Sequence, residues 1–292
     1  MRRVKAPMVR AVVWLLAATV VALGGSACLP EATPTPTAAP APVGVPAKQA
    51  GKPEGTVTVG FHTFSKEIMD PSLDGATGLI VYGQIFDWWI GTTPAGKLDT
   101  AYGVVESYKP SPDAKVWTFT LKKGIKWHDG VEMSSDDMKW TLEYYSRAAA
   151  ICTMCGTVKA NLDRVEIVDR YTARLHLKRA NVNIPAEFAP LEGDLKMLPK
   201  HYFEKVGADA FAQKPLGSGP WKFVGRGLGQ FIEYEANTEY WNPSRVPGFA
   251  KLRLLLVPEA RTRVAMLKRG EVDLISVDSQ DVEPPRRPWA TR

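Results

Sequence analysis

Hydrophobic and polar residues alternate most regularly over residues 116–121, where every second side chain is apolar. A period of two is typical of a β-strand whose two faces meet different surroundings. Polar turns follow at Lys123-Gly124 and Asp129-Gly130, because glycine tolerates positive φ and aspartate bonds its own backbone. The serine pair at 134–135 then caps a helix predicted over residues 136–147. This stretch predicts strand, turn, short strand and helix in succession.

The same reasoning places further elements along the chain. A helical face of apolar residues runs over residues 76–90, and a second helix over residues 262–268 ends at Gly270. We expect residues 148–159 to be irregular. Alternating patterns predict a first strand, two hairpins and a late strand, at residues 56–61, 165–177, 221–234 and 252–257. Predicted strands and helices are therefore interspersed along the chain.

The N-terminus has the pattern of an export signal. Four basic residues precede the apolar run 11–23, which is too short to span a membrane, and small residues lead to Cys28. This arrangement resembles a bacterial lipoprotein signal over residues 1–27, with Cys28 as the lipidated residue. An ordinary secretory signal or an uncleaved anchor is the alternative. Residues 28–55 are rich in proline, alanine and threonine and read as an unfolded tether.

Charge and cysteine content agree with export. The chain of 292 residues has a formal net charge of +6, and removal of the four positive charges of the leader brings it to +2. A basic surface for nucleic acid therefore loses its support. With Cys28 lipidated, Cys152 and Cys155 remain as candidates for a local disulfide in an oxidising compartment. A redox or metal CxxC is the alternative, although no second CxxC or nearby histidine accompanies it.

Three segments resemble one family, the family 5 extracellular solute-binding proteins of peptide, dipeptide and nickel ABC importers. They are VWTFTLKKGIKWHDGVEMSSDDMKW at residues 116–140, PLGSGPWKFVGRGLGQFIEYEANTEYWN at residues 215–242, and TRVAMLKRGEVDLI at residues 262–275. The resemblance covers roughly residues 55–277. It implies an α/β fold over residues 56–277, a periplasmic-binding-protein-like (type II) lobe with mixed sheets and flanking helices. Family members are far longer, so we expect the second lobe to be missing, with an irregular tail at residues 278–292.

The resemblance implies a receptor without catalysis or cofactor. We expect it to be a monomer, lipid-anchored at the outer face of the cytoplasmic membrane or periplasmic, which delivers a peptide-like solute to ABC permease subunits. A truncated remnant that binds weakly is the alternative. Because binding clefts have aromatic walls, the candidate ligand residues are aromatic ones near the cleft-facing loops: Phe61, Phe64, Tyr82, Trp88, Trp89 and Trp221. Neighbours on a helix cannot both face one core, so either Trp88 or Trp89 should be exposed or at an interface.

An exported hydrolase is the less favoured class. Ser218 lies between two glycines, but Pro220 follows and no strand-turn-helix context surrounds it. His128 and Asp129 are neighbours on a turn, where side chains diverge, so we expect structural roles for both. Asp70 precedes Pro71, which indicates a turn and a capping role. The sequence has no Walker A lysine and no clustered metal ligands.

Overall fold

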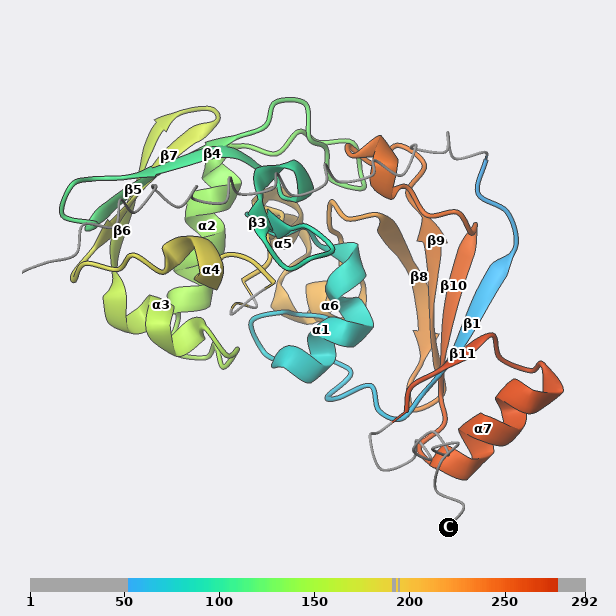
Figure 1. The fold of residues 1–292 in the computed structure, drawn as a ribbon. Helices are drawn as coiled ribbons and strands as arrows, with labels where there is room; N and C mark the ends of the chain where they lie inside the picture. The colour runs from blue at the N-terminus through green and yellow to red at the C-terminus, as the bar shows by residue number, and fades with distance from the viewer. Residues whose placement is uncertain (1–51, 191–192, 194, 278–292) are drawn as a thin grey trace, which may run out of the picture. The chain divides into compact units, whose positions relative to one another are not determined.

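Two β-sheets organise the part of the chain that the computed structural model describes, residues 52–190, 193 and 195–277 (Figure 1). The predicted leader, Cys28, most of the tether and the tail lie outside the described residues. Within the described ranges, no helix is long and apolar enough to cross a membrane.

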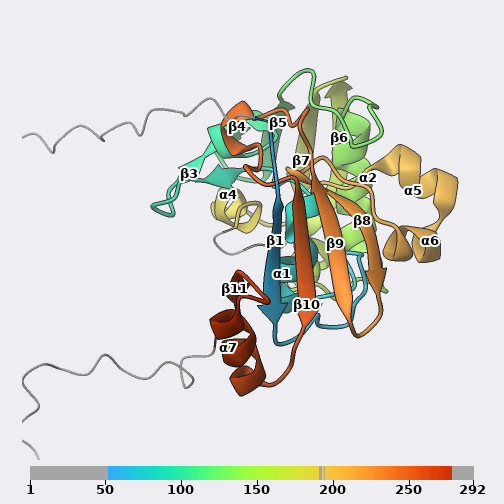
Figure 2. The ribbon, with the colours of Figure 1, turned by 90° about the vertical axis from the view of Figure 1, so that its right-hand side faces the viewer.

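The first sheet has five strands in the order β11-β1-β10-β9-β8 (Figure 2). β1 pairs in parallel with both β10 and β11, whereas β8, β9 and β10 are antiparallel. The predicted first strand, second hairpin and late strand are thus confirmed. The strands are β1 (Thr56–Phe61), β8 (Trp221–Gly227), β9 (Phe231–Ala236), β10 (Lys251–Leu256) and β11 (Leu274–Ile275).

The second sheet is antiparallel, in the order β4-β5-β7-β6. On β5 the side chains of Trp117, Phe119 and Leu121 are buried, as their alternation predicts, and the predicted first hairpin forms β6 and β7. A short ribbon of β2 and β3 accompanies the sheet. The strands are β2 (Gly91–Thr92), β3 (Leu98–Asp99), β4 (Val105–Pro110), β5 (Val116–Leu121), β6 (Leu162–Asp169) and β7 (Thr172–Leu177).

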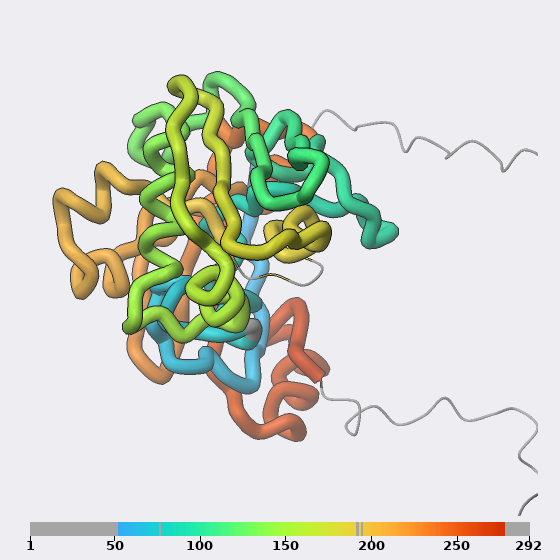
Figure 3. The backbone as a smooth tube through the Cα atoms, turned by 90° about the vertical axis from the view of Figure 1, so that its left-hand side faces the viewer, coloured from blue at the N-terminus to red at the C-terminus, as the bar shows by residue number. Residues whose placement is uncertain are grey.

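Helix α2 packs against β6 and β7 (Figure 3). It begins where predicted, because the backbone N–H of Ser134 donates to the carboxylate of Asp137 at 2.9 Å. α7 ends at Gly270, whose φ of 71° is the left-handed conformation that glycine favours at this position. The α-helices are α1 (Ala76–Tyr82), α2 (Ser135–Ser146), α3 (Cys155–Asn161), α4 (Ile184–Glu187), α5 (Lys200–Val206), α6 (Ala208–Gln213) and α7 (Ala260–Arg269); the 3₁₀ turns are η1 (Gly83–Ile85), η2 (Thr100–Tyr102) and η3 (Pro243–Arg245).

Two predictions about local structure are wrong. The helix expected over residues 76–90 ends at Tyr82 and continues only as the η1 turn, because the backbone beyond it pairs elsewhere: Ile90 N–H donates to Phe188 O at 3.2 Å. Residues 148–159, expected to be irregular, include the start of α3. The second cysteine of the CxxC, Cys155, is the first residue of this helix.

The core is aromatic where the second sheet meets the segment after α1. Trp89 is fully buried between the rings of Phe119 and Phe188, with centroids 5.9 and 5.0 Å away in edge-to-face geometry. Such pairs add about 0.5–1.5 kcal/mol to the burial of their area. Trp88, its neighbour, is only half-buried. The expectation that one of the pair would be exposed or at an interface rested on a helix, and α1 ends at Tyr82. Trp89 lies in the core, and Trp88 is neither exposed nor fully buried.

Asp87 joins three distant segments in the interior. Its carboxylate accepts hydrogen bonds from Tyr240 Oη at 2.6 Å, Trp241 Nε1 at 2.9 Å and Ser218 Oγ at 2.9 Å. Beside it, a Cβ at Gly217 would lie 2.0 Å from the carbonyl oxygen of Ile85, so only glycine allows this close approach. The buried carboxylate ties the segment after α1 to both ends of the β8–β9 hairpin.

Candidate ligand-binding face

The carboxyl ends of β1, β10 and β11 meet at one edge of the five-stranded sheet, because these three strands are parallel neighbours. In open α/β sheets, ligands bind beyond the carboxyl ends of the strands. Three segments leave this edge: the loop of residues 62–75, the turn from β10 into α7, and residues 276–277 after β11. We call this region the carboxyl edge.

Backbone and side-chain bonds hold the carboxyl edge together. The backbone N–H of His62 donates to Ser276 Oγ, and His62 Nδ1 lies at the same distance of 3.0 Å from that hydroxyl. The buried guanidinium of Arg263 donates to the carbonyls of Ser276, Val257 and Pro258 at 2.8 to 2.9 Å. Side chains from β1, α7 and the end of β11 therefore fix the strand ends in one arrangement.

The loop after β1 contains two residues in an uncommon backbone conformation. Ser65 and Glu67 have φ values of 56° and 54°, a region that non-glycine residues seldom occupy. Ser65 Oγ donates to Asp74 Oδ1 at 2.8 Å, and the Glu67 carboxylate accepts from Gly229 N–H at 3.0 Å. Strained residues of this kind persist where surrounding contacts hold them, and they cluster at ligand sites.

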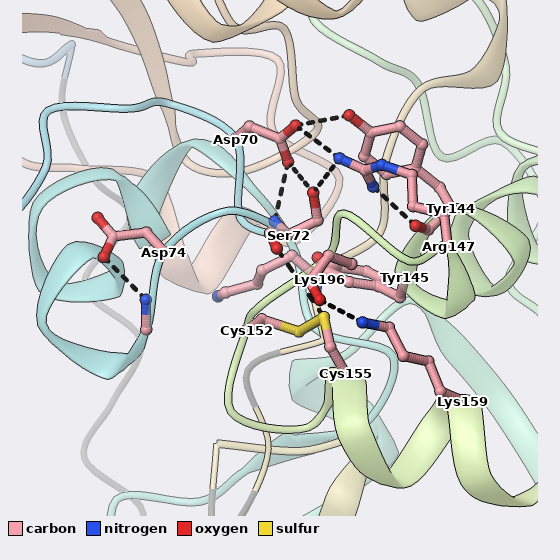
Figure 4. Close-up of a disulfide and its surroundings, with 12 residues drawn as sticks. Asp70, Ser72, Asp74, Tyr144, Tyr145, Arg147, Cys152, Cys155, Lys159 and Lys196 are labelled. Carbon is pink, nitrogen blue, oxygen red and sulfur yellow. Dashed lines mark hydrogen bonds and ion pairs between the residues drawn. A yellow bond between two sulfur atoms is a disulfide. The ribbon is translucent and has the colours of Figure 1, made fainter.

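Asp70 orders the second half of this loop (Figure 4). Its Oδ1 accepts from the N–H and the hydroxyl of Ser72, and its Oδ2 accepts from Tyr144 Oη at 2.6 Å and lies 3.6 Å from Arg147. Burial and the nearby Asp70 carboxylate raise the pKa of Tyr144. The capping role expected for Asp70 is present, and the same carboxylate also anchors the loop to α2.

A disulfide-bearing segment lies against the loop. Cys152 and Cys155 are joined by a disulfide, with their Cα atoms 5.0 Å apart. The N–H groups of Ile151 and Cys152 donate to Ser72 O at 2.8 and 3.2 Å. These two backbone bonds hold the segment beside the loop of residues 62–75 (Figure 4), and the Ile151 side chain stays 59% exposed.

The six predicted aromatic residues do not gather at one place. Phe64, Tyr82 and Trp89 are buried in the core. Phe61 is half-buried at the end of β1, its ring stacked against His62 at 6.0 Å. Trp88 and Trp221 line a cavity of about 590 Å³ near the amino ends of β1 and β10. Of the predicted set, Phe61 and Phe64 lie on segments of the carboxyl edge, and of these two only Phe61 is partly exposed.

Sequence reasoning missed the His62–Ser276 contact and the strained pair in the loop. The strained pair could not be predicted, because serine and glutamate are not residue types that favour a positive φ. His62 and Ser276 are 214 positions apart in the chain. Exposed apolar side chains at Leu274 and Val277, 57% and 52% exposed, flank Ser276 and complete the carboxyl edge.

The residues weighed for hydrolysis have structural partners. His128 Nε2 lies 2.9 Å from Gly219 O, and burial lowers the pKa of His128 to about 4. Asp129 pairs instead with His201 at 2.8 Å, and Ser218 donates to Asp87. In the part of the chain that the structure describes, no group of histidine, cysteine or acidic residues could hold a metal ion.

Periplasmic binding proteins are among the solved structures that superpose on this chain. DppA of Helicobacter pylori in complex with the peptide STSA superposes with a TM-score of 0.66 at 25% identity, over 75% of this chain and 46% of that one. AppA of Bacillus subtilis in complex with a nonapeptide gives a TM-score of 0.68 at 24% identity, over 79% and 46%. The fold is therefore that of a periplasmic solute-binding protein, as the sequence predicts.

The family follows from the sequence match. Residues 100–287 match the model of the bacterial extracellular solute-binding proteins, family 5, and the chain belongs to this family. A putative ABC transporter peptide-binding protein of Brucella ovis is 29% identical over 248 residues, 81% of this chain and 44% of that protein. The oligopeptide-binding protein AppA of Bacillus subtilis is 27% identical over 63% of this chain and 34% of its own length. The chain thus spans less than half the length of these relatives, which are solute-binding proteins and not enzymes.

Proposed function

We propose that this chain is the solute-binding component of an ABC importer and that it receives a peptide-like solute at the carboxyl edge. Family membership supports the role, and the names of the Brucella and Bacillus relatives support a peptide as the solute. Other similar proteins carry different cargo: one is a heme-binding protein of Haemophilus influenzae, and another was solved with Ni(L-His). The solute class therefore needs a direct test.

The observation that carries the proposal is the arrangement of the carboxyl edge. The pinned loop after β1 and the crosslinked segment beside it offer a preformed surface, which lowers the entropy cost of ordering on binding. β11 is the outer strand of its sheet in the described part of the chain, and the side chain of its Leu274 is exposed. An extended peptide can pair its backbone with the unpaired side of an outer strand.

Calorimetry with mixed tri- to pentapeptides tests this function. We expect weak binding, because the match covers only 44% of the Brucella relative. Leu274→Asp should remove the binding by placing a charge at the carboxyl edge. Val224→Asp is the matched control, because Val224 is 53% exposed on β8, away from this edge. Equal loss in both variants, or equal retention, would contradict the assignment.

The lipid anchor at Cys28 and delivery to a permease are also proposals. The signal-like leader and the proline-rich tether that follows support a folded unit held at a membrane surface. Membrane fractionation of the expressed chain and of Cys28→Ala tests the anchor. The parent chain should sediment with membranes and the variant should be released, whereas identical fractionation would exclude lipidation at Cys28.

A further inference from the structure

A second concave site lies away from the carboxyl edge. The cavity of about 590 Å³ opens beside Phe249, which precedes β10, and beside Trp221, which begins β8. Its volume falls within the range of about 300–1,000 Å³ that small-molecule sites occupy. The walls that matter here combine three aromatic residues with three charged ones, namely Trp88, Trp221, Phe249, Lys196, Arg245 and Asp87.

Lys196 is an unusual wall residue because it is 3% exposed and yet lines this cavity. Its Nζ lies 3.2 Å from Gly83 O, 3.4 Å from Phe86 O and 3.7 Å from the centroid of the Trp88 ring. An ammonium group has three donors. Among the described residues two carbonyls accept two of them, and the Trp88 ring lies beside the ammonium group.

The wall holds two cations and one carboxylate, that of Asp87, so its net charge stays positive. The two oxygens of Asp87 already accept three hydrogen bonds, from Tyr240, Trp241 and Ser218. Arg245 stands at the exposed rim, and burial together with this second cation outweighs Asp87 and lowers the pKa of Lys196 to about 7. An anion placed between the two cations would relieve their repulsion.

We propose that this cavity binds a small organic anion with a carboxylate and a flat aromatic ring. The carboxylate accepts from Lys196 and pairs with Arg245, while the ring packs against the Trp221 and Phe249 side chains. Charge-assisted bonds to a buried donor are stronger than neutral ones, and aromatic walls hold a planar body in one orientation. The inference does not depend on peptide binding, because the cavity and the carboxyl edge lie at opposite ends of β1.

Naphthalene-2-carboxylate is the probe that tests the site, with naphthalene-2-carboxamide as its neutral match. Titration of the full chain should quench tryptophan fluorescence saturably with the acid and hardly at all with the amide. Lys196→Met should weaken binding of the acid at least about tenfold, the loss of one charge-assisted hydrogen bond. Arg245→Gln should weaken it less, because that side chain is exposed.

Lys122→Met is the matched control. Lys122 also donates to two backbone carbonyls, those of Thr100 and Gly103, and lies 4.6 Å from the centroid of the Trp241 ring, but it does not line the cavity. Its replacement should leave the affinity for the acid unchanged. If Lys196→Met fails to fold, Arg245→Gln decides the question. Equal binding of acid and amide, wild-type affinity in the cavity variants, or no saturable binding by the parent chain would overturn the proposal.

Discussion

The buried carboxylate of Asp87 offers the sharpest test of how this chain is held together. Asp87→Asn keeps the shape of the side chain and removes its charge and one acceptor oxygen. In the wild type, Tyr240, Trp241 and Ser218 all donate to this carboxylate, and Lys196 lies close enough to interact with it electrostatically. Burial raises the pKa of Asp87, and these donors and the cation oppose that shift.

The magnitude follows from what the amide cannot do. An asparagine has one oxygen for donors that reach two, so at least one buried donor loses its acceptor, which costs about 1–3 kcal/mol. Lys196 also loses the electrostatic attraction of this carboxylate, and leaving a buried charge uncompensated costs about 3–5 kcal/mol. Because the two losses overlap, we expect a net destabilisation of about 3–5 kcal/mol. For a unit of this size that corresponds to a fall in the melting temperature of about 10 °C.

Thermal unfolding followed by circular dichroism measures this effect. Asp113→Asn is the control, because Asp113 is also a hydrogen-bonded acceptor, from Ser111 Oγ at 2.6 Å, but lies on the surface. The control should melt with the wild type. Tyr240→Phe, which deletes one donor, should lie between the two. If Asp87→Asn had the same melting temperature as the wild type, the hydrogen bonds to the Asp87 carboxylate would not stabilise the fold.

Three further predictions concern other parts of the structure. Burial lowers the pKa of His128 to about 4, so the neutral side chain stabilises the fold above the unfolded value of 6.5, and this contribution is lost as the pH falls toward 4. His128→Gln should therefore make the free energy of unfolding, measured with urea, less dependent on pH in this range. Gly217→Ala places a methyl group against a backbone carbonyl and should cost several degrees of melting temperature, whereas Gly225→Ala, in open space, should not. Replacing Cys152 and Cys155 by alanine opens a four-residue loop and should cost about 2 kcal/mol in the chain-entropy model, and an unchanged denaturation midpoint would refute a stabilising crosslink.

The sequence predicted well wherever a local pattern decides the structure. β5 alternates in burial as its residues alternate in polarity, and Gly270 ends α7. The helical face read over residues 76–90 was misleading past Tyr82, because Ile85, Phe86 and Ile90 are buried by neighbours from other segments and not by helical periodicity. Hydrophobic residues enclosed on all sides carry no period that distinguishes a helix from an irregular chain.

The sites were harder to predict because they depend on distant contacts. The residues that donate to Asp87 lie 131 to 154 positions away in the chain, and the sequence around Asp87 does not predict which residues they are. The aromatic residues chosen as ligand contacts share a residue type but not a location, since three fill the core and two line the cavity. The motifs identified the family, whereas the placement of individual side chains required the fold.

The most direct test of the central claim is a map of where a peptide touches the chain. Methyl-resolved NMR detects weak binding, so it applies even where calorimetry gives little heat. As a peptide mixture is raised to its solubility limit, the methyl signals of Leu274 and Val277 should shift, and those of Val224 and Leu228 on the β8–β9 hairpin should not. Shifts confined to the hairpin, or no shifts at any of these methyl groups, would contradict a ligand-binding face at the carboxyl edge.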